Sequence, residues 1–292
     1  MLPDTINLHF TPYCNARCQF CFAKYSEVQS PCSTQSLKKI IDLIAQEPAS
    51  DQLRRVNFVG GEPTIHKDLP ALLTHAKLCG LQTSIVSNGL EMLIHSIEPY
   101  AGCTDMIGLS IDSIAPNVIA QAGRLHRTSG YLPDRLDWLN LAGKIHNSSI
   151  KLKINTVVQR LNHDEDMNDF IAGMTPRQWK IFQVTKIDGQ NDIDFQKWKI
   201  RREEFNNYCF RHRNLVKQGI RVTHENSDLM LNSYAIIGPN GCFVDNASGK
   251  HLYSRPIEEV GIVEAWAEIR FDSESFVARR GLGGPKKEVA YV

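Results

Sequence analysis

The sequence predicts an α/β fold: a partial (βα)6 barrel with a parallel sheet, and a C-terminal extension that closes the barrel. Short runs rich in β-branched residues alternate with amphipathic segments between residues 5 and 185. Strands that alternate with helices in this way form βαβ units and a parallel sheet. The six units found here are fewer than the eight of a complete barrel, so we expect a curved and partly open sheet.

The expected elements follow one another along the chain. Strands are expected at residues 5–10, 54–59, 82–86, 104–111, 150–158 and 179–184. Helices are expected at residues 34–47, 67–78, from the turn at 87–89 to about 98, 134–146 and 164–174. After residue 190 the rhythm changes, and a helix around residues 200–218 is followed by less regular sequence. We therefore divide the chain into a barrel, residues 1–190, and an extension, residues 191–292, that covers the cavity of the barrel.

The composition is that of an ordinary globular protein. The chain has 292 residues and a mass of 33.0 kDa, its formal net charge is +1, and 42% of its residues are hydrophobic. A balanced charge gives no basic surface for nucleic acid, so we expect no nucleic-acid partner. No apolar run approaches the roughly 20 residues that span a bilayer, and the N-terminus lacks the order of a signal peptide. We expect a cytoplasmic protein with no membrane partner.

Three of the eight cysteines lie within eight residues, in a loop that follows the first predicted strand. Cys14, Cys18 and Cys21 are spaced C-x3-C-x2-C. Three thiolates on one short loop can bind three irons of a [4Fe-4S] cluster and leave the fourth iron open. Zinc, or buried thiols without a ligand, are the alternatives, but structural zinc takes four ligands and no fourth Cys or His completes the loop. We expect these three cysteines to be metal ligands.

Alternation along the predicted strands places several polar side chains on one face of the sheet. Arg55, Lys153 and Lys180 lie opposite the apolar residues of their strands, and successive strand residues point to opposite faces. We expect the three cations to converge on one cavity with few acids nearby. A triphosphate would neutralise them through charge-assisted hydrogen bonds, whereas lysines at strand ends would instead extend into water. The same face carries Asn7, Asn57 and Asn155.

The cysteine spacing, with an aromatic residue before the third cysteine, resembles that of the radical S-adenosylmethionine (SAM) superfamily. The segment Gly60-Gly61-Glu62-Pro63 follows the second predicted strand and matches the GGEP segment of that superfamily, which pairs with the methionine amino group of SAM. Adjacent glycines let backbone atoms approach a ligand closely. The resemblance implies further SAM contacts at or beyond strand carboxyl ends, from Asn88, Ser110 and Arg124.

One branch of the superfamily, the viperins, resembles most of this chain. The similar segments include residues 7–11, 56–58, 84–89, 153–155 and 179–183 and, in the extension, residues 225–227 and 232–234. The resemblance implies an antiviral lyase that converts a ribonucleoside triphosphate, with CTP first and UTP or GTP as alternatives, to its 3′-deoxy-3′,4′-didehydro form through a 5′-deoxyadenosyl radical. It implies a one-electron donor of the flavodoxin or ferredoxin type, and Tyr234 as the residue that relays the last hydrogen. It implies a nucleotide held by Asn7, Arg55, Asn57, Lys153, Asn155 and Lys180.

Three features depart from the viperin pattern. Gln178 stands where the animal enzymes have a phosphate-binding arginine, Arg55 stands where they have lysine, and the usual terminal aspartate-tryptophan pair is absent. We therefore expect the residues that bind the phosphates to differ from those of the animal enzymes. The tail at residues 280–286 is expected either to fold over the phosphates or to stay disordered.

Two other functions stay open. The first is a radical SAM enzyme that modifies a peptide or another small molecule, but Cys209 and Cys242 lack the C-x-x-C partners that would bind extra clusters. The second is a non-catalytic iron–sulfur protein that senses redox state or acts as a scaffold. That role would leave the GGEP segment and the cationic face without a purpose.

Overall fold

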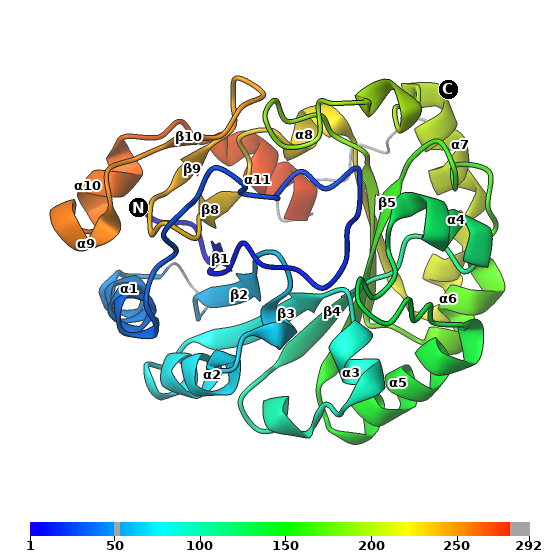
Figure 1. Cartoon of the computed structure of the whole chain (residues 1–292), viewed down its shortest axis with the longest axis horizontal. Helices are drawn as coiled ribbons and strands as arrows, with labels where there is room; N and C mark the ends of the chain where they lie inside the picture. The colour runs from blue at the N-terminus through cyan, green and yellow to red at the C-terminus, as the bar shows by residue number, and fades with distance from the viewer. Residues whose placement is uncertain (50–52, 281–292) are drawn as a thin grey trace.

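The computed structural model describes residues 1–49 and 53–280. Its centre is one sheet of eight parallel strands in the order β7-β6-β5-β4-β3-β2-β1-β8, which curls into a half-barrel (Figure 1). A separate antiparallel ribbon joins β9 to β10. The strands are β1 (Thr5–His9), β2 (Arg55–Val59), β3 (Gln82–Ser87), β4 (Met106–Ser110), β5 (Lys151–Val158), β6 (Gln178–Gln183), β7 (Arg221–Glu225), β8 (Ala235–Ile237), β9 (Val244–Asp245) and β10 (Leu252–Tyr253).

Helices lie on the outer side of the curled sheet, and the loop that follows β1 crosses its open inner side (Figure 1). The α-helices are α1 (Thr34–Gln46), α2 (Leu69–Leu78), α3 (Leu90–Ile94), α4 (Pro116–Ala122), α5 (Arg135–Asn147), α6 (Asn168–Met174), α7 (Arg202–Arg211), α8 (Ser227–Met230), α9 (Ile257–Val260), α10 (Ile262–Ala267) and α11 (Ser273–Arg280). Short 3₁₀ helices are η1 (Pro63–Ile65), η2 (Glu98–Tyr100), η3 (Phe195–Lys197) and η4 (Arg213–Gln218). Within the described residues, none of the helices combines the length and the apolar character needed to cross a bilayer.

Strand alternation explains which face of the sheet is covered by helices. In β2, Val56 and Phe58 are fully buried. Arg55 and Asn57, which alternate with them, are partly exposed on the other face. Burying each apolar side chain contributes roughly 1.5–3 kcal/mol, so the face that carries them turns toward the helices. The inner face is then left to polar residues.

The predicted fold class and all six predicted barrel strands are confirmed, with strand ends that differ by at most two residues. The helices expected at 34–47, 67–78, 134–146 and 164–174 are α1, α2, α5 and α6. The extension contributes more than expected, because β7 and β8 join the two edges of the sheet. Neither strand has a readable apolar pattern: β7 is Arg-Val-Thr-His-Glu and β8 has three residues.

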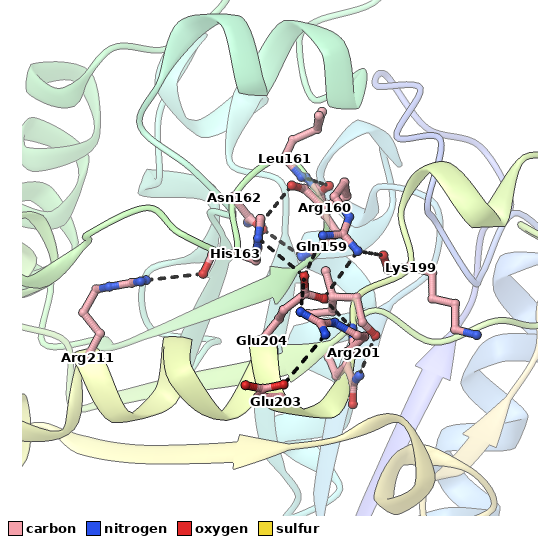
Figure 2. Close-up of polar contacts among 12 residues, drawn as sticks. Gln159, Arg160, Leu161, Asn162, His163, Lys199, Arg201, Glu203, Glu204 and Arg211 are labelled. Carbon is pink, nitrogen blue, oxygen red and sulfur yellow. Dashed lines mark hydrogen bonds and ion pairs between the residues drawn. The ribbon is translucent and has the colours of Figure 1, made fainter.

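Surface ion pairs join the extension to the loop after β5 (Figure 2). Arg160 donates hydrogen bonds to both carboxylate oxygens of Glu204, at 2.8 and 3.3 Å, and to the Lys199 carbonyl at 3.1 Å. The backbone nitrogen of Arg201 donates to Glu204 Oε2 at 2.7 Å. The bond from Arg160, followed by that from Arg201, lowers the pKa of Glu204 to about 2. Pairs at the surface stabilise only modestly, so they hold α7 in place without dominating the fold.

Candidate active site at the carboxyl ends of the strands

The loop that carries the three cysteines is pressed against the end of β2 by a pair of glycines. Gly61 N donates to the Thr11 carbonyl (2.6 Å), and Glu62 N donates to the Tyr13 carbonyl (2.7 Å). A Cβ atom on Gly61 would lie 2.1 Å from the Tyr13 oxygen, and one on Gly60, whose φ is +146°, would lie 2.5 Å from the Thr11 oxygen. Only glycine fits at these positions. The expected approach of a ligand to these glycines stays a prediction; in the structure it is the backbone of the cysteine loop that approaches them closely.

The turn after α4 holds the same loop from its other side. Arg17 N donates to the Gly123 carbonyl (3.0 Å), and Gln19 N donates to the Ala122 carbonyl (3.2 Å). Gly123 has a φ of +74°, and a Cβ atom there would lie 2.2 Å from the Arg17 oxygen. Backbone contacts therefore fix the loop between α4 and the GGEP segment.

Cys14, Cys18 and Cys21 are free and partly buried. Burial raises the pKa of Cys14 to about 12 and that of Cys18 to about 11, so the thiols keep their protons until a metal displaces them. Tetrahedral zinc with 2.3 Å bonds would need sulfur atoms about 3.8 Å apart. Across the described part of the chain, these three sulfurs do not form a set in which all lie within 4.8 Å of one another. The wider spacing fits the larger [4Fe-4S] cluster better than zinc.

Arg124 lies beside the cysteines and is paired with a buried acid. Its Nε lies 2.5 Å from Oδ2 of Asp112, and both side chains are largely buried. Its charge lowers the pKa of Cys18 and Cys21, in opposition to the larger effect of burial. Arg124 is therefore placed to stabilise thiolates, and its contact with SAM stays a prediction.

Glu62 is almost fully buried and joins the GGEP segment to the end of β3. Its Oε1 accepts hydrogen bonds from Ser87 Oγ (2.6 Å) and from Thr64 N (3.1 Å) and Oγ1 (2.6 Å). Its Oε2 accepts one bond, from Asn88 N (2.7 Å). Because a carboxylate oxygen can accept more than one bond, Oε2 retains a position for an amino group of a ligand. The segment ends at Pro63, the first residue of η1.

Asn88 connects the end of β3 to the cysteine loop. Its Nδ2 donates to Asn15 Oδ1 (2.7 Å) and lies 3.9 Å from Cys14 Sγ, and its Oδ1 accepts a bond from Leu90 N (3.0 Å). Two residues predicted to bind SAM, Glu62 and Asn88, are thus hydrogen-bonded together and lie next to a predicted cluster ligand.

Polar residues on both halves of the sheet form rows in register. On β1, β2 and β3 the row is Asn7, Asn57 and Ser84, in which Asn57 Nδ2 donates to Asn7 Oδ1 (2.8 Å) and Ser84 Oγ donates to Asn57 Oδ1. Two residues earlier on β2, Arg55 donates to Gln82 Oε1 (2.5 Å), while its buried Nε has no hydrogen-bond partner among the described residues.

The second row crosses β4, β5 and β6 and consists of Ser110, Asn155 and Lys180. Asn155 Oδ1 is buried and has no partner within the described residues. A buried acceptor without a donor is costly in a protein and often marks a place where a ligand or a water supplies the missing bond.

Lys153, Lys180 and Arg279 gather around one buried carboxylate. Glu225, at the end of β7, forms an ion pair with Lys180 and lies 3.7 Å from the Arg279 guanidinium. Burial lowers the pKa of Lys153 to about 7 and that of Lys180 to about 8. The charges of Lys180, Arg279 and Arg55 lower the pKa of Lys153 further, and Glu225 raises it. The three cations expected to converge therefore lie near one another, and one acid, Glu225, lies among them.

Tyr234 lies at the centre of this ion network. Lys180 Nζ donates to its hydroxyl (2.8 Å), the hydroxyl donates to Glu225 Oε2, and the Arg279 guanidinium stacks 3.6 Å from the ring centroid. Burial raises the pKa of Tyr234 well above its ordinary value, so the phenol keeps its hydrogen at neutral pH. The hydroxyl of Tyr234 is therefore neutral and held in one orientation by two charged partners, and its role in hydrogen transfer stays a prediction.

Glu225 and Arg279 belong to this ion network but were not among the residues predicted from the sequence. Arg279 lies on α11 and donates two hydrogen bonds to the Ser233 carbonyl, at 3.1 and 2.6 Å. Glu225 ends a strand that follows β6 in the sheet but lies some forty residues later in the chain. The tail expected to fold over the phosphates lies outside the described residues from residue 281 onward.

Comparison with known proteins gives a consistent result. A family model described as the radical SAM superfamily matches residues 8–172. Over 280 residues, the chain is 38% identical to an S-adenosylmethionine-dependent nucleotide dehydratase of Flammeovirga pacifica, which covers 95% of this chain and 94% of that protein. Over 294 residues, it is 30% identical to the S-adenosylmethionine-dependent nucleotide dehydratase RSAD2 of Oncorhynchus mykiss, with 96% and 80% covered. The crystal structure of Streptococcus suis SuiB bound to S-adenosylmethionine has the same fold: the TM-score is 0.68 at 16% identity, with 98% of this chain and 69% of that chain covered.

Proposed function

Because this chain belongs to the radical SAM superfamily, and within it to the S-adenosylmethionine-dependent nucleotide dehydratases, we propose that it converts a ribonucleoside triphosphate, CTP first, to its 3′-deoxy-3′,4′-didehydro form. The observation that carries the proposal is the cationic inner face beside Tyr234. Lys153 lies close enough to Lys180, Arg279 and Arg55 for their charges to lower its pKa, and the acid Glu225 raises it. A peptide substrate would not require so many buried cations.

Residues in the loops that follow β1, β2 and β3 fit the cofactors of the superfamily. Cys14, Cys18 and Cys21 would hold three irons of the [4Fe-4S] cluster. Glu62 would accept a hydrogen bond from the amino group of SAM through its free position on Oε2, and Asn88 would keep Glu62 in place. When both are bound and the cluster is reduced, the cluster and SAM would together supply the 5′-deoxyadenosyl radical that removes a ribose hydrogen.

The cations would hold the triphosphate and thereby position the ribose. Phosphate oxygens can form charge-assisted hydrogen bonds with Lys153, Lys180 and Arg279, and an anion favours the charged form of both lysines. The buried Asn155 Oδ1 and Arg55 Nε have no hydrogen-bond partner in the described part of the chain, and a nucleotide would provide one for each. Positioning is the main task, because only one C–H bond of the ribose must face the reacting group.

Tyr234 would supply the final hydrogen. In the dehydration, the C4′–H bond and the C3′–O bond break, a C3′=C4′ double bond forms, and the hydroxyl leaves as water. One electron and one proton are needed to balance these changes. The Tyr234 O–H would deliver both as a hydrogen atom to the leaving hydroxyl, and a one-electron donor together with a proton from water would then reduce the phenoxyl radical left on Tyr234. Glu225 accepts the phenol hydrogen in a hydrogen bond and so orients it, while Lys180 donates to the same oxygen. Glu225 is thus a positioning residue for Tyr234.

We also propose that a one-electron donor of the flavodoxin or ferredoxin type re-reduces the enzyme in the cytoplasm. The loop with the three cysteines offers an accessible surface for such a donor, since Tyr13 on that loop is 63% exposed. Electrons could then reach the cluster without crossing the substrate cavity.

The test is an anaerobic reaction of the cluster-loaded enzyme with dithionite, SAM and each of CTP, UTP and GTP in turn. We expect one nucleotide to yield a product lighter by one water, with one 5′-deoxyadenosine formed for each dehydrated nucleotide. Release of 5′-deoxyadenosine at the same rate with and without nucleotides, and with no dehydrated product, would contradict the proposal.

A further inference from the structure

A second group of metal-ligand side chains lies on the outer helices, far from the cysteine loop. Asp42 belongs to α1, His75 belongs to α2, and Cys79 is the residue that ends α2. Figure 1 shows α1 and α2 side by side on the outer side of the sheet, and the two helices are in contact. Three potential ligand atoms, one from each residue, all lie within 4.8 Å of one another. In the described part of the chain, this is the one group of three His, Cys or acidic side chains whose ligand atoms lie this close together.

The spacing in the sequence explains how the group forms. His75 and Cys79 are four residues apart, so they point to the same side of α2. Asp42 comes from the adjacent helix and closes the group. The two helices are in contact, and Ile41 of α1 and Leu72 and Leu73 of α2 are buried in the same hydrophobic core.

We propose that Asp42, His75 and Cys79 form a binding site for a zinc-type divalent cation. The ligand set combines an imidazole nitrogen, a thiolate sulfur and a carboxylate oxygen, and zinc accepts all three. A carboxylate and a thiolate together carry two negative charges, which balance a divalent ion. A water molecule would fill the fourth position, because the site is open to solvent: the His75 and Asp42 side chains are 26% and 43% exposed.

The distances between the ligand atoms are close to those of a tetrahedral site. His75 Nε2 lies 2.7 Å from Asp42 Oδ1 and 3.9 Å from Cys79 Sγ, and Cys79 Sγ lies 3.4 Å from Asp42 Oδ1. Tetrahedral zinc would place the nitrogen and oxygen about 3.4 Å apart and the sulfur about 3.6 Å from each. The largest change needed, about 0.7 Å, replaces the hydrogen bond between His75 and Asp42 with two bonds to the metal. Small side-chain rotations can provide it.

The position of the site separates it from the dehydration chemistry. Cys79 lies three residues before β3, at the amino ends of the parallel strands, whereas the cysteine loop follows the carboxyl end of β1. The two metal sites therefore lie at opposite ends of the barrel, and residues at the amino ends usually serve stability rather than catalysis. Bound metal would join α1 to α2 and stabilise the fold without changing the dehydration step.

The experiment uses the enzyme with its iron–sulfur cluster fully loaded, so that Cys14, Cys18 and Cys21 cannot take up zinc. Zinc is titrated in competition with a chromophoric chelator, and the zinc-loaded protein is studied by zinc X-ray absorption. We expect one zinc ion per chain, bound by one sulfur and three nitrogen or oxygen atoms. A thermal unfolding temperature that rises with zinc concentration would follow from binding to the folded state.

Variants separate this site from other zinc-binding positions. Cys79→Ser and His75→Ala should each weaken zinc binding by at least about tenfold, and both should reduce the effect of zinc on thermal unfolding. Cys32→Ser is the matched control, since Cys32 is another partly buried cysteine outside the group, and it should bind zinc like the unmodified protein. SAM cleavage and nucleotide dehydration should be unchanged in Cys79→Ser, so failure of the proposed function and failure of this site give different results.

Three outcomes would overturn the proposal. They are the absence of zinc binding at micromolar concentration, zinc binding that Cys79→Ser and His75→Ala leave unchanged, and an absorption spectrum of the unmodified protein with no sulfur ligand. The last measurement needs no variant, so it decides the matter even if a variant fails to fold.

Discussion

The two sides of the inner face of the barrel are built by different means. Beside β1 and β2, backbone hydrogen bonds and glycines that leave no room for a side chain hold the cysteine loop. Beside β6 and β7, Lys180, Glu225, Tyr234 and Arg279 hold one another through charge and hydrogen bonds. The first side is a frame whose shape is set by the backbone, and the second is an ion network whose balance changes when an anion binds. Substitutions on the first side should therefore remove the cofactor, and those on the second should alter substrate binding and turnover.

Gly61→Ala should have the largest effect, because it damages the frame directly. The new Cβ would lie 2.1 Å from the Tyr13 oxygen, which belongs to the backbone and cannot simply rotate away. We expect the iron content after anaerobic reconstitution, and the formation of 5′-deoxyadenosine, to fall at least about tenfold. Gly143→Ala is the control: apart from its chain neighbours and the backbone of α5 itself, no described atom lies within 4 Å of a Cβ added there, and alanine should stabilise that helix by up to about 1 kcal/mol. Equal iron content in both variants would contradict the claim that the backbone contacts of Gly61 hold the cysteine loop in place.

Tyr234→Phe should separate the two halves of the reaction. The variant keeps the ring under Arg279 but loses the O–H that we assign to the last hydrogen transfer. Dehydrated nucleotide should decrease at least about 100-fold, while 5′-deoxyadenosine still forms and the Kd of CTP changes little. Quantifying both products in the same reaction checks this. A parallel fall of both products would mean that Tyr234 acts before the hydrogen abstraction.

Glu225→Gln should destabilise the free protein more than the nucleotide complex. Removing the carboxylate leaves Lys180 and Arg279 without their buried partner, and such a loss costs about 3 kcal/mol of unfolding free energy. A bound triphosphate supplies negative charge at the same place, so CTP should restore part of the loss in urea unfolding. Glu258→Gln, which alters an exposed pair with Lys39, should cost less than about 0.5 kcal/mol. If CTP stabilises both variants equally, the cations do not hold the phosphates.

The pH dependence of CTP binding should show the smallest effect. Lys153 and Lys180 have pKa values lowered to about 7 and 8, so both are charged below pH 7 and lose their charge as the pH rises through these values. Binding an anion favours the charged form, so each lysine must take up a proton above its lowered pKa. The Kd should therefore rise from pH 7 to pH 9, by up to about tenfold per pH unit for each lysine involved. In calorimetric titrations, Lys180→Met should weaken the dependence of the Kd of CTP on pH. A Kd that stays constant over this range in the unmodified enzyme would contradict the assignment.

The sequence predicted the frame better than the ion network, for a physical reason. Cys14 and Glu62 lie in short segments next to strands with clear alternation, so their placement follows from local sequence. The convergence of Lys153 and Lys180 also follows from alternation, because both lie on adjacent strands of one sheet. Glu225 lies on a strand without an apolar pattern, and Arg279 lies on a helix that no local feature links to the barrel. Their positions depend on how the extension pairs with the sheet, which neither composition nor spacing reveals.

The most direct test of the central claim follows the hydrogen that leaves the ribose. CTP labelled with deuterium at C4′ is incubated anaerobically with the cluster-loaded enzyme, SAM and dithionite, and the 5′-deoxyadenosine is examined by mass spectrometry. We predict that deuterium from C4′ appears in 5′-deoxyadenosine, and that deuterium placed at C3′ or C5′ does not. Unlabelled 5′-deoxyadenosine from the C4′-labelled nucleotide, at a rate equal to that without nucleotide, would show that this inner face does not present the C4′–H bond of CTP to the radical.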